Sequence, residues 1–286
     1  MLEKLKLYAQ LMRLDRPIGI YLLLWPTLWA LWIAAQGFPD FKVLLIFVSG
    51  VILMRSAGCV INDYADRDFD GKVARTKDRP LATGKVSTKE ALLLFALLAL
   101  AALLLVLQLN KTTILLSVVA ILLAASYPFM KRFHFLPQVH LGFAFGWSVP
   151  MAYSAVTGQL PSLTGWLIFI ANILWTVAYD TMYALTDKED DLQIGVKSTA
   201  ILFGNHNRLI IGSLQVLTLL ILVSIGSLNN FSVVYYATLL VAAVFMVYQQ
   251  YLLAQSGSVN GLRAFLNNNW VGMSVFLGLL LHFAYR

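Results

Sequence analysis

Long uncharged stretches alternate with short polar segments along almost the whole chain. Residues 91–109 read ALLLFALLALAALLLVLQL, and residues 209–226 read LIIGSLQVLTLLILVSIG. A helix needs about 20 such residues to cross the hydrocarbon core of a bilayer. Few other structures can hydrogen-bond all of their backbone N–H and C=O groups there. The pattern predicts an all-α, polytopic integral membrane protein with nine transmembrane helices. The predicted spans are residues 17–36, 42–62, 90–108, 112–130, 136–157, 163–186, 208–228, 231–253 and 268–285.

We expect residues 1–286 to form a single membrane-embedded domain. The first span is too long and too rich in tryptophan for a cleaved signal peptide. Ahead of it, residues 2–16 alternate leucines with lysines and arginines, a pattern typical of a helix that lies in the membrane interface. A solvated cap on the bundle is the alternative interpretation of the same pattern.

Composition and charge agree with a membrane protein. Hydrophobic residues make up 59% of the 286 and charged residues only 12%, against about 25% charged residues in soluble proteins. Most of the 21 lysines and arginines precede the first span or follow even-numbered spans, and the opposite side receives only Lys42, Lys111 and Arg286. The positive-inside rule then predicts a cytoplasmic N-terminus, with the C-terminus on the opposite side of the membrane. The net charge of +7 therefore indicates topology and anion attraction, not nucleic-acid binding.

The acidic residues are concentrated in two clusters, and the first closes the second predicted span. Successive residues of a helix are about 100° apart, so Asp63, Asp66 and Asp70 share one face with Asn62. Asp68 points away from that face, toward solvent or a basic neighbour. Topology alone requires no such spacing, which favours a functional stripe of acids.

The second cluster closes the sixth predicted span in the same way. Asp180, Asp187 and Asp191 fall on one helical face with Asp190 at its edge. Because the clusters occupy equivalent places in two halves of the chain, we expect a pseudo-symmetric bundle in which they meet at the centre.

Two facing stripes of carboxylates predict a hard cation between them. Cys59 is the only cysteine and the four histidines are scattered, so ligation by oxygen alone points to Mg²⁺, which binds carboxylates together with substrate phosphates. The neighbouring lysines and arginines are candidates to hold anionic oxygens, although for Lys77 a role in topology alone is the favoured interpretation. The candidates are Arg75, Lys77, Arg79, Lys131, Arg132 and Lys197.

A membrane-embedded site for magnesium and an oligophosphate suits a lipid donor, most simply a polyprenyl diphosphate. Loss of diphosphate from such a donor leaves an allylic cation, which aromatic faces stabilise through cation–π contact. The aromatic residues near the acids are Tyr127, Trp175, Tyr179 and Tyr183.

Arg55 stands inside the second span, seven residues before Asn62 and on the same face as the acids. An arginine within a membrane is costly and is a candidate for function. It either pairs with an acid of the second cluster or meets the carboxylate of a small aromatic acceptor.

Three motifs together resemble the UbiA superfamily of intramembrane prenyltransferases, in particular its 4-hydroxybenzoate polyprenyltransferases. The motif Asn-Asp-x-x-Asp-x-x-x-Asp reads NDYADRDFD at 62–70, and Asp-x-x-x-Asp reads DKEDD at 187–191. The Tyr-x-x-x-Lys element reads YPFMK at 127–131. The segments that resemble the 4-hydroxybenzoate branch are 14–32, 54–84 and 197–204.

The resemblance implies a nine-helix bundle with a central cavity open to the bilayer. It implies transfer of a polyprenyl group, expected to be octaprenyl, to the ring carbon ortho to the hydroxyl of 4-hydroxybenzoate, in ubiquinone biosynthesis. We expect Arg55 to orient the acceptor carboxylate, Asp180 to assist loss of the phenol proton, and Tyr127 and Tyr183 to stabilise the carbocation. The residues implied to hold Mg²⁺ and diphosphate are Asp63, Asp66, Asp70, Asp187 and Asp191, with Asp66 and Asp187 essential for turnover. Those implied to contact diphosphate are Asn62, Arg75, Arg79, Lys131 and Arg132.

Two other classes of protein are disfavoured. CDP-alcohol phosphotransferases place magnesium-binding aspartates in a membrane helix, but their pattern requires acids where this chain has Arg67, Thr88 and Leu92. A transporter would use acids within its spans as an ion relay, whereas these acids lie at span ends beside basic loops.

Overall fold

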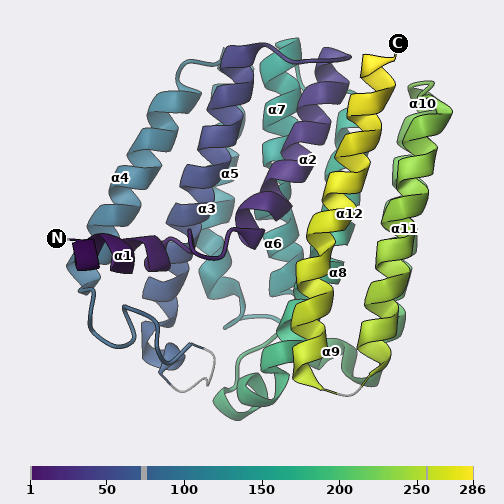
Figure 1. The fold of residues 1–286 in the computed structure, drawn as a ribbon. Coiled ribbons are helices and arrows are strands. Elements are labelled where there is room, and N and C mark those ends of the chain that lie inside the picture. Colours follow the sequence, from purple (N-terminus) through teal and green to yellow (C-terminus); the bar gives the residue numbers. More distant parts are fainter. Residues whose placement is uncertain (1, 72–75, 256, 286) are drawn as a thin grey trace.

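Helices run up and down through the whole molecule, with one short helix lying across them (Figure 1). The computed structural model describes residues 2–71, 76–255 and 257–285. A 3₁₀ turn at Gly204–His206 precedes α10. The α-helices are α1 (Leu2–Leu11), α2 (Ile18–Ala35), α3 (Phe41–Asp70), α4 (Thr88–Val106), α5 (Lys111–Met130), α6 (Pro137–Gly146), α7 (Ser148–Thr157), α8 (Leu163–Ile194), α9 (Thr199–Phe203), α10 (Asn207–Leu228), α11 (Val233–Ala254) and α12 (Ser258–Ala284).

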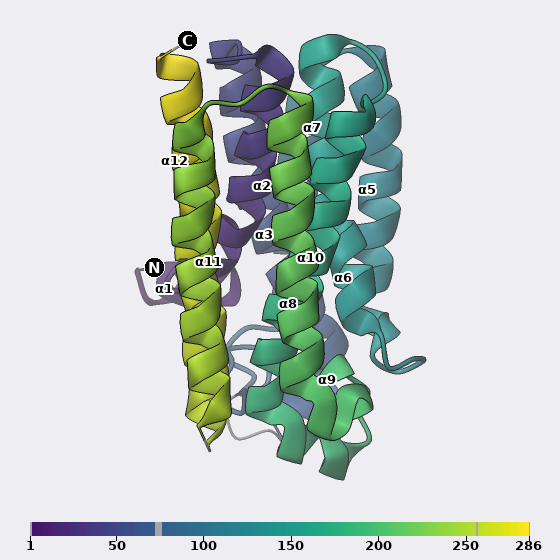
Figure 2. The ribbon, with the colours of Figure 1, turned by 90° about the vertical axis from the view of Figure 1, so that its right-hand side faces the viewer.

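Eight helices of the described chain are long and apolar enough to cross a membrane, and they make it an integral multi-pass membrane protein. The predicted fifth span is not one helix but two, α6 and α7, which meet at Trp147 and run end to end (Figure 2). Pro150 explains the break, because it has no N–H to donate to the carbonyl of Gly146. The expectation of nine single-helix spans is therefore wrong at this segment.

The last helix begins ten residues earlier than its predicted span, and polar residues in the first half of this helix pair with side chains of other helices. Asn268 is buried, and its side-chain oxygen accepts a hydrogen bond from Nε1 of Trp175 at 2.8 Å. Asn269 accepts one from Nε1 of Trp25 at 3.0 Å. A side-chain amide that is hydrogen-bonded to a neighbouring helix in this way can be buried in a membrane protein at little cost in free energy.

The core joins α2, α8 and α12 through tryptophan rings. The rings of Trp29 and Trp175 stack with centroids 5.5 Å apart, and both residues are almost fully buried. Trp29 also donates to the carbonyl of Gly272 on α12 at 3.1 Å. These contacts tie the helix that carries the second acid cluster to the N-terminal half of the chain.

The N-terminal helix α1 is shorter than the predicted 2–16 and packs across α3. It ends at Leu11, which is fully buried, and Arg13 then adopts a left-handed backbone with φ 57°. Lys4 pairs with Glu90 at the start of α4, and this hydrogen bond raises the pKa of Lys4. The exposed face keeps Leu5, as an interfacial helix would.

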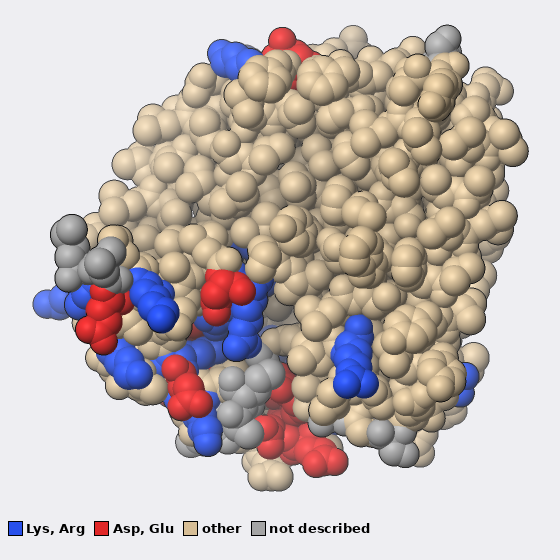
Figure 3. All heavy atoms as spheres, viewed as in Figure 1, with Lys and Arg blue, Asp and Glu red and all other residues tan. Residues whose placement is uncertain are grey.

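Both acid-bearing helices are longer than a bilayer crossing requires. At about 1.5 Å per residue, the 30 residues of α3 and the 32 of α8 exceed the roughly 30 Å hydrocarbon core. Both helices end at the same end of the molecule (Figure 1). In Figure 3 the charged side chains of this face gather toward that end, below a wide uncharged band.

Candidate active site

A cavity of about 1270 Å³ opens between α2, α3, α5, α8 and α12. One part of its wall is apolar and includes Val51, Leu103, Val106 and Ile121, from α3, α4 and α5. The other part carries most of the polar residues singled out by the sequence. These are Arg55, Asn62, Asp63, Asp66, Asp70, Arg79, Tyr127, Lys131, Tyr179, Asp180, Tyr183, Asp187, Asp191 and Lys197.

The first acid cluster lies on one face of α3, as helical spacing predicts. Asp63, Asp66 and Asp70 are buried, with exposures of 1%, 3% and 6%, and all three line the cavity. Asp68 projects away from it, with 73% of its side chain exposed beside Arg67. The prediction that Asp68 differs from its neighbours is confirmed.

Arginine and lysine side chains neutralise these buried carboxylates. Arg79 approaches Asp63 at 2.9 Å and Asp70 at 2.8 Å, and it follows α3 in the chain. Lys131, at the end of α5, donates to Oδ2 of Asp66. That same oxygen accepts a hydrogen bond from Nδ2 of Asn62 at 3.2 Å. Buried carboxylates are tolerated only with such partners.

Arg13 is a site residue that sequence reasoning missed. Its Nη2 lies 2.9 Å from both carboxylate oxygens of Asp63, and it lines the cavity. Its side chain is 23% exposed, and its Nη1 also donates to the carbonyl of Gln10. In the sequence, Arg13 is one of several cations before the first span. No local sequence pattern predicts the left-handed turn that directs its side chain toward the cavity.

The second acid cluster faces the first across the cavity. Asp180, Asp187 and Asp191 all line it from α8, which remains one helix as far as Ile194. Asp190 instead borders a separate, smaller hollow with Lys188. The two stripes of acids therefore reach one cavity, although they come from helices far apart in the sequence.

The donor set fits a hard cation. Within the described residues, no three carboxylate, imidazole or thiol groups lie close enough to form a ready-made metal site. Oδ1 of Asp66 is nevertheless buried without a hydrogen-bond partner. A carboxylate oxygen left in this state beside further acids is suited to Mg²⁺, which takes a few carboxylates together with phosphate oxygens.

Arg132 and Trp175 do not line the cavity. Arg132 donates to the backbone carbonyl of Ala65 and lies over the ring of Phe129. Trp175 belongs to the core and hydrogen-bonds to α12, so its interpretation as a carbocation-stabilising residue is wrong. Arg75 lies outside the described residues.

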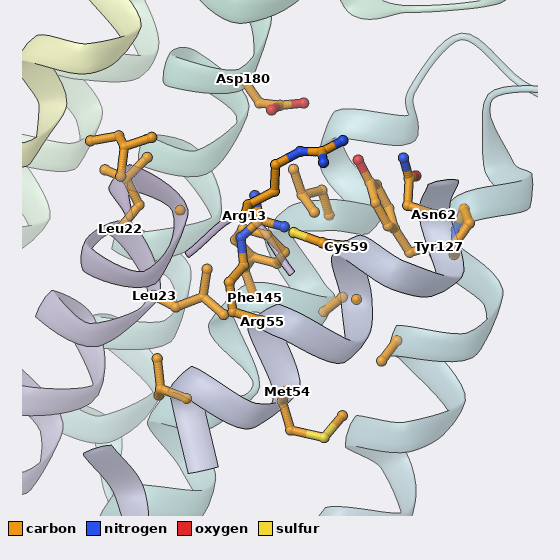
Figure 4. Close-up of a pocket in the computed structure, with 18 of the residues that line it drawn as sticks. Arg13, Leu22, Leu23, Met54, Arg55, Cys59, Asn62, Tyr127, Phe145 and Asp180 are labelled. Carbon is orange, nitrogen blue, oxygen red and sulfur yellow. The ribbon is translucent and has the colours of Figure 1, made fainter. Parts of the chain in front are cut away.

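Arg55 lies on α3 ahead of the first acid cluster, eight residues before Asp63. Its guanidinium carbon is 5.5 Å from the ring centroid of Phe145, and its Nε is buried without a hydrogen-bond partner among the described residues. None of the ion pairs found among the described residues includes Arg55. Figure 4 shows Arg55, Cys59 and Phe145 near one another, with Asp180 and Tyr127 projecting into the same space.

Comparison with known proteins assigns the chain to a family. The sequence profile of the UbiA prenyltransferase family matches residues 23–280. The chain belongs to the UbiA prenyltransferase family. This UbiA-family chain is 61% identical to the 4-hydroxybenzoate octaprenyltransferase of Tolumonas auensis over 274 residues, which cover 96% of each protein. It is 60% identical to that of Nitrosococcus oceani over 283 residues, or 99% of each.

Solved structures agree on the fold. The apo structure of a UbiA homologue from Aeropyrum pernix superposes with a TM-score of 0.81 and 24% identity, covering 92% of this chain and 97% of the homologue. The homologue from Archaeoglobus fulgidus bound to GPP and Mg²⁺ gives 0.72 and 16%, covering 96% and 99%. The family resemblance read from the sequence motifs is confirmed.

Proposed function

We propose that this UbiA-family chain transfers an octaprenyl group from octaprenyl diphosphate to 4-hydroxybenzoate in ubiquinone biosynthesis. One observation carries the proposal: two stripes of acids, on α3 and α8, line a single cavity whose remaining wall is largely apolar. A lipid diphosphate needs both surfaces, and the full-length likeness to 4-hydroxybenzoate octaprenyltransferases supports this donor and this acceptor. The cavity would be the central chamber of a nine-span bundle in a bacterial inner membrane, with the acids at its cytoplasmic mouth.

The polyprenyl tail would lie along the apolar wall. Leu103, Val106 and Ile121 belong to α4 and α5 and line the cavity. The spanning windows of these two helices are only 11% buried within the protein, so most of their surface is left for the bilayer. A long tail can therefore leave the cavity into lipid without burying a polar group.

The diphosphate head would bind at the acidic end. Asp63, Asp66 and Asp70 from α3, with Asp187 and Asp191 from α8, would hold Mg²⁺, which offsets the charge that builds on the departing diphosphate. Arg79, Lys131 and Arg13 pair with the α3 acids. When metal and diphosphate bind, these cations are placed to exchange carboxylate oxygens for phosphate oxygens, with Asn62 as a further donor.

The acceptor would lie between the head group and Arg55. Arg55 is seven residues before Asn62 on α3, about 10.5 Å along the helix axis, and its Nε has no hydrogen-bond partner in the part of the chain that the structure describes. A benzoate carboxylate would supply that partner and direct the ring toward the donor. The allylic C–O bond would then break and diphosphate would leave as a C–C bond forms ortho to the hydroxyl. Asp180 would take the phenol proton, and the proton displaced from the ring carbon would return to the oxygen as the ring regains aromaticity, so that one proton is released overall.

Aromatic side chains would surround the reacting carbon. Tyr127 and Tyr183 line the cavity from α5 and α8, and the ring of Tyr183 packs 4.8 Å from that of Phe265. Their electron-rich faces would stabilise positive charge on the allyl group while excluding water.

The proposal is tested with purified protein in detergent or vesicles. Octaprenyl diphosphate, 4-hydroxybenzoate and Mg²⁺ are supplied together and singly, and prenylated product and free diphosphate are measured. We expect both products only when all three are present. Shorter prenyl diphosphates and aromatic acids without the 4-hydroxyl group define the donor range and the acceptor requirement. Diphosphate release that does not depend on the aromatic acid would contradict the proposed acceptor.

A further inference from the structure

The side chain of Arg55 occupies the space that a side chain at position 19 of α2 would need. Gly19 is buried in the first turn of α2 and lines the cavity. A Cβ atom at this position would come within 2.5 Å of Nη2 and 2.7 Å of Cζ of Arg55, and closer still to Nε. The guanidinium therefore lies directly against the α2 backbone.

Backbone conformation does not explain the glycine. Gly19 is helical and does not appear among the glycines with positive φ, and glycine disfavours helix formation relative to alanine. Two other helical glycines of the cavity wall, Gly50 and Gly58, have no atom within 4 Å of an added Cβ. The close approach of Arg55 is thus particular to Gly19.

Among the described residues, the contacts found for Arg55 are not ionic. Its guanidinium meets the ring of Phe145 and the backbone at Gly19, and its Nε has no hydrogen-bond partner within this part of the chain. An arginine positioned by such packing contacts can be displaced by a small change in that packing. Displacement would move the group that receives the acceptor.

We propose that Gly19 is a positioning residue for the acceptor: it keeps free the space in which the Arg55 guanidinium is held toward the 4-hydroxybenzoate carboxylate. This rests on the acceptor role given to Arg55 under the proposed function. Because the guanidinium ends a flexible side chain, an added methyl group displaces Arg55 while the fold is retained. A shift of about 1 Å in a substrate-orienting group can cost about 100-fold in rate.

The test is a kinetic double-mutant cycle of Gly19→Ala and Arg55→Ala. Gly19→Ala is expected to raise the KM for 4-hydroxybenzoate by about tenfold to 100-fold, with the KM for the prenyl diphosphate nearly unchanged. In the Arg55→Ala background, Gly19→Ala is expected to add nothing, because the displaced group is gone. Gly212→Ala is the matched control: it lies in α10, away from the cavity, with no atom nearer than 3.5 Å to an added Cβ.

Three results would overturn the inference. These are an unchanged acceptor KM in Gly19→Ala, an equal rise in both KM values, or an effect that persists in full in the Arg55→Ala background. If Gly19→Ala proves unstable, melting temperatures supply the same cycle: Arg55→Ala must restore the temperature, and failure to do so contradicts the inference. An unchanged acceptor KM in Arg55→Ala alone would instead refute the role of Arg55 in the proposed function.

Discussion

Arg13 and Asp63 are fifty residues apart in the sequence, yet one guanidinium nitrogen lies 2.9 Å from both oxygens of the carboxylate. The contact depends on the left-handed turn at Arg13 that follows the end of α1. It ties the crosswise N-terminal helix to the buried acids of α3. The N-terminal segment is therefore part of the wall of the candidate site.

Replacing Arg13 is predicted to weaken use of the prenyl donor. Arg13→Ala removes a charge-assisted hydrogen bond worth about 1.5–3 kcal/mol, so the KM for prenyl diphosphate should rise by about tenfold or more. Arg67→Ala is the control, because Arg67 is exposed beside Asp68 and does not line the cavity. Equal kinetics in the two variants would show that Arg13 serves only to hold α1.

Replacing Arg55 is predicted to affect the acceptor and spare the donor. Arg55→Ala leaves the carboxylate of 4-hydroxybenzoate without its charged partner, so the acceptor KM should rise by about tenfold to 100-fold. Initial rates measured over both substrate concentrations separate the two KM values. If both substrates lost affinity to the same degree, the acceptor role would have to be abandoned.

Replacing Asn268 is predicted to lower stability without acting on substrates directly. Asn268→Leu leaves the buried Nε1–H of Trp175 without its acceptor, which costs about 1–3 kcal/mol. The melting temperature in detergent should fall, while the KM values of the remaining folded enzyme stay close to those of the wild type. Ser224→Ala, at an exposed position of α10, should leave the melting temperature unchanged.

The sequence predicts best those features that depend on local periodicity. Apolar runs locate the long helices, and the 100° step correctly separates the buried Asp63, Asp66 and Asp70 from the exposed Asp68. This works because hydrophobicity and helical spacing are properties of neighbouring residues. The same reasoning brings the acids of α8 to the cavity, since α8 continues unbroken through them.

Features set by distant contacts could not be predicted. The predicted last span starts at residue 268, whereas α12 starts at Ser258, and the buried amide of Asn268 is explained by its pairing with Trp175. Arg132 is adjacent to Lys131 in the sequence, but the two side chains have different partners. Lys131 donates to the carboxylate of Asp66, and Arg132 donates to the backbone carbonyl of Ala65. These side-chain partners are determined by tertiary packing, which local sequence patterns do not reveal.

The central claim is that acids on α3 and α8 act together as one site for a magnesium-bound diphosphate. The most direct measurement is Mg²⁺-dependent octaprenyl transfer to 4-hydroxybenzoate by Asp66→Asn and Asp187→Asn, with Asp68→Asn as the matched control from the same segment. We predict that each of the first two variants folds, inserts and loses about 100-fold or more of its turnover, while Asp68→Asn keeps wild-type activity. Near-normal transfer by either Asp66→Asn or Asp187→Asn would contradict a site shared between the two helices.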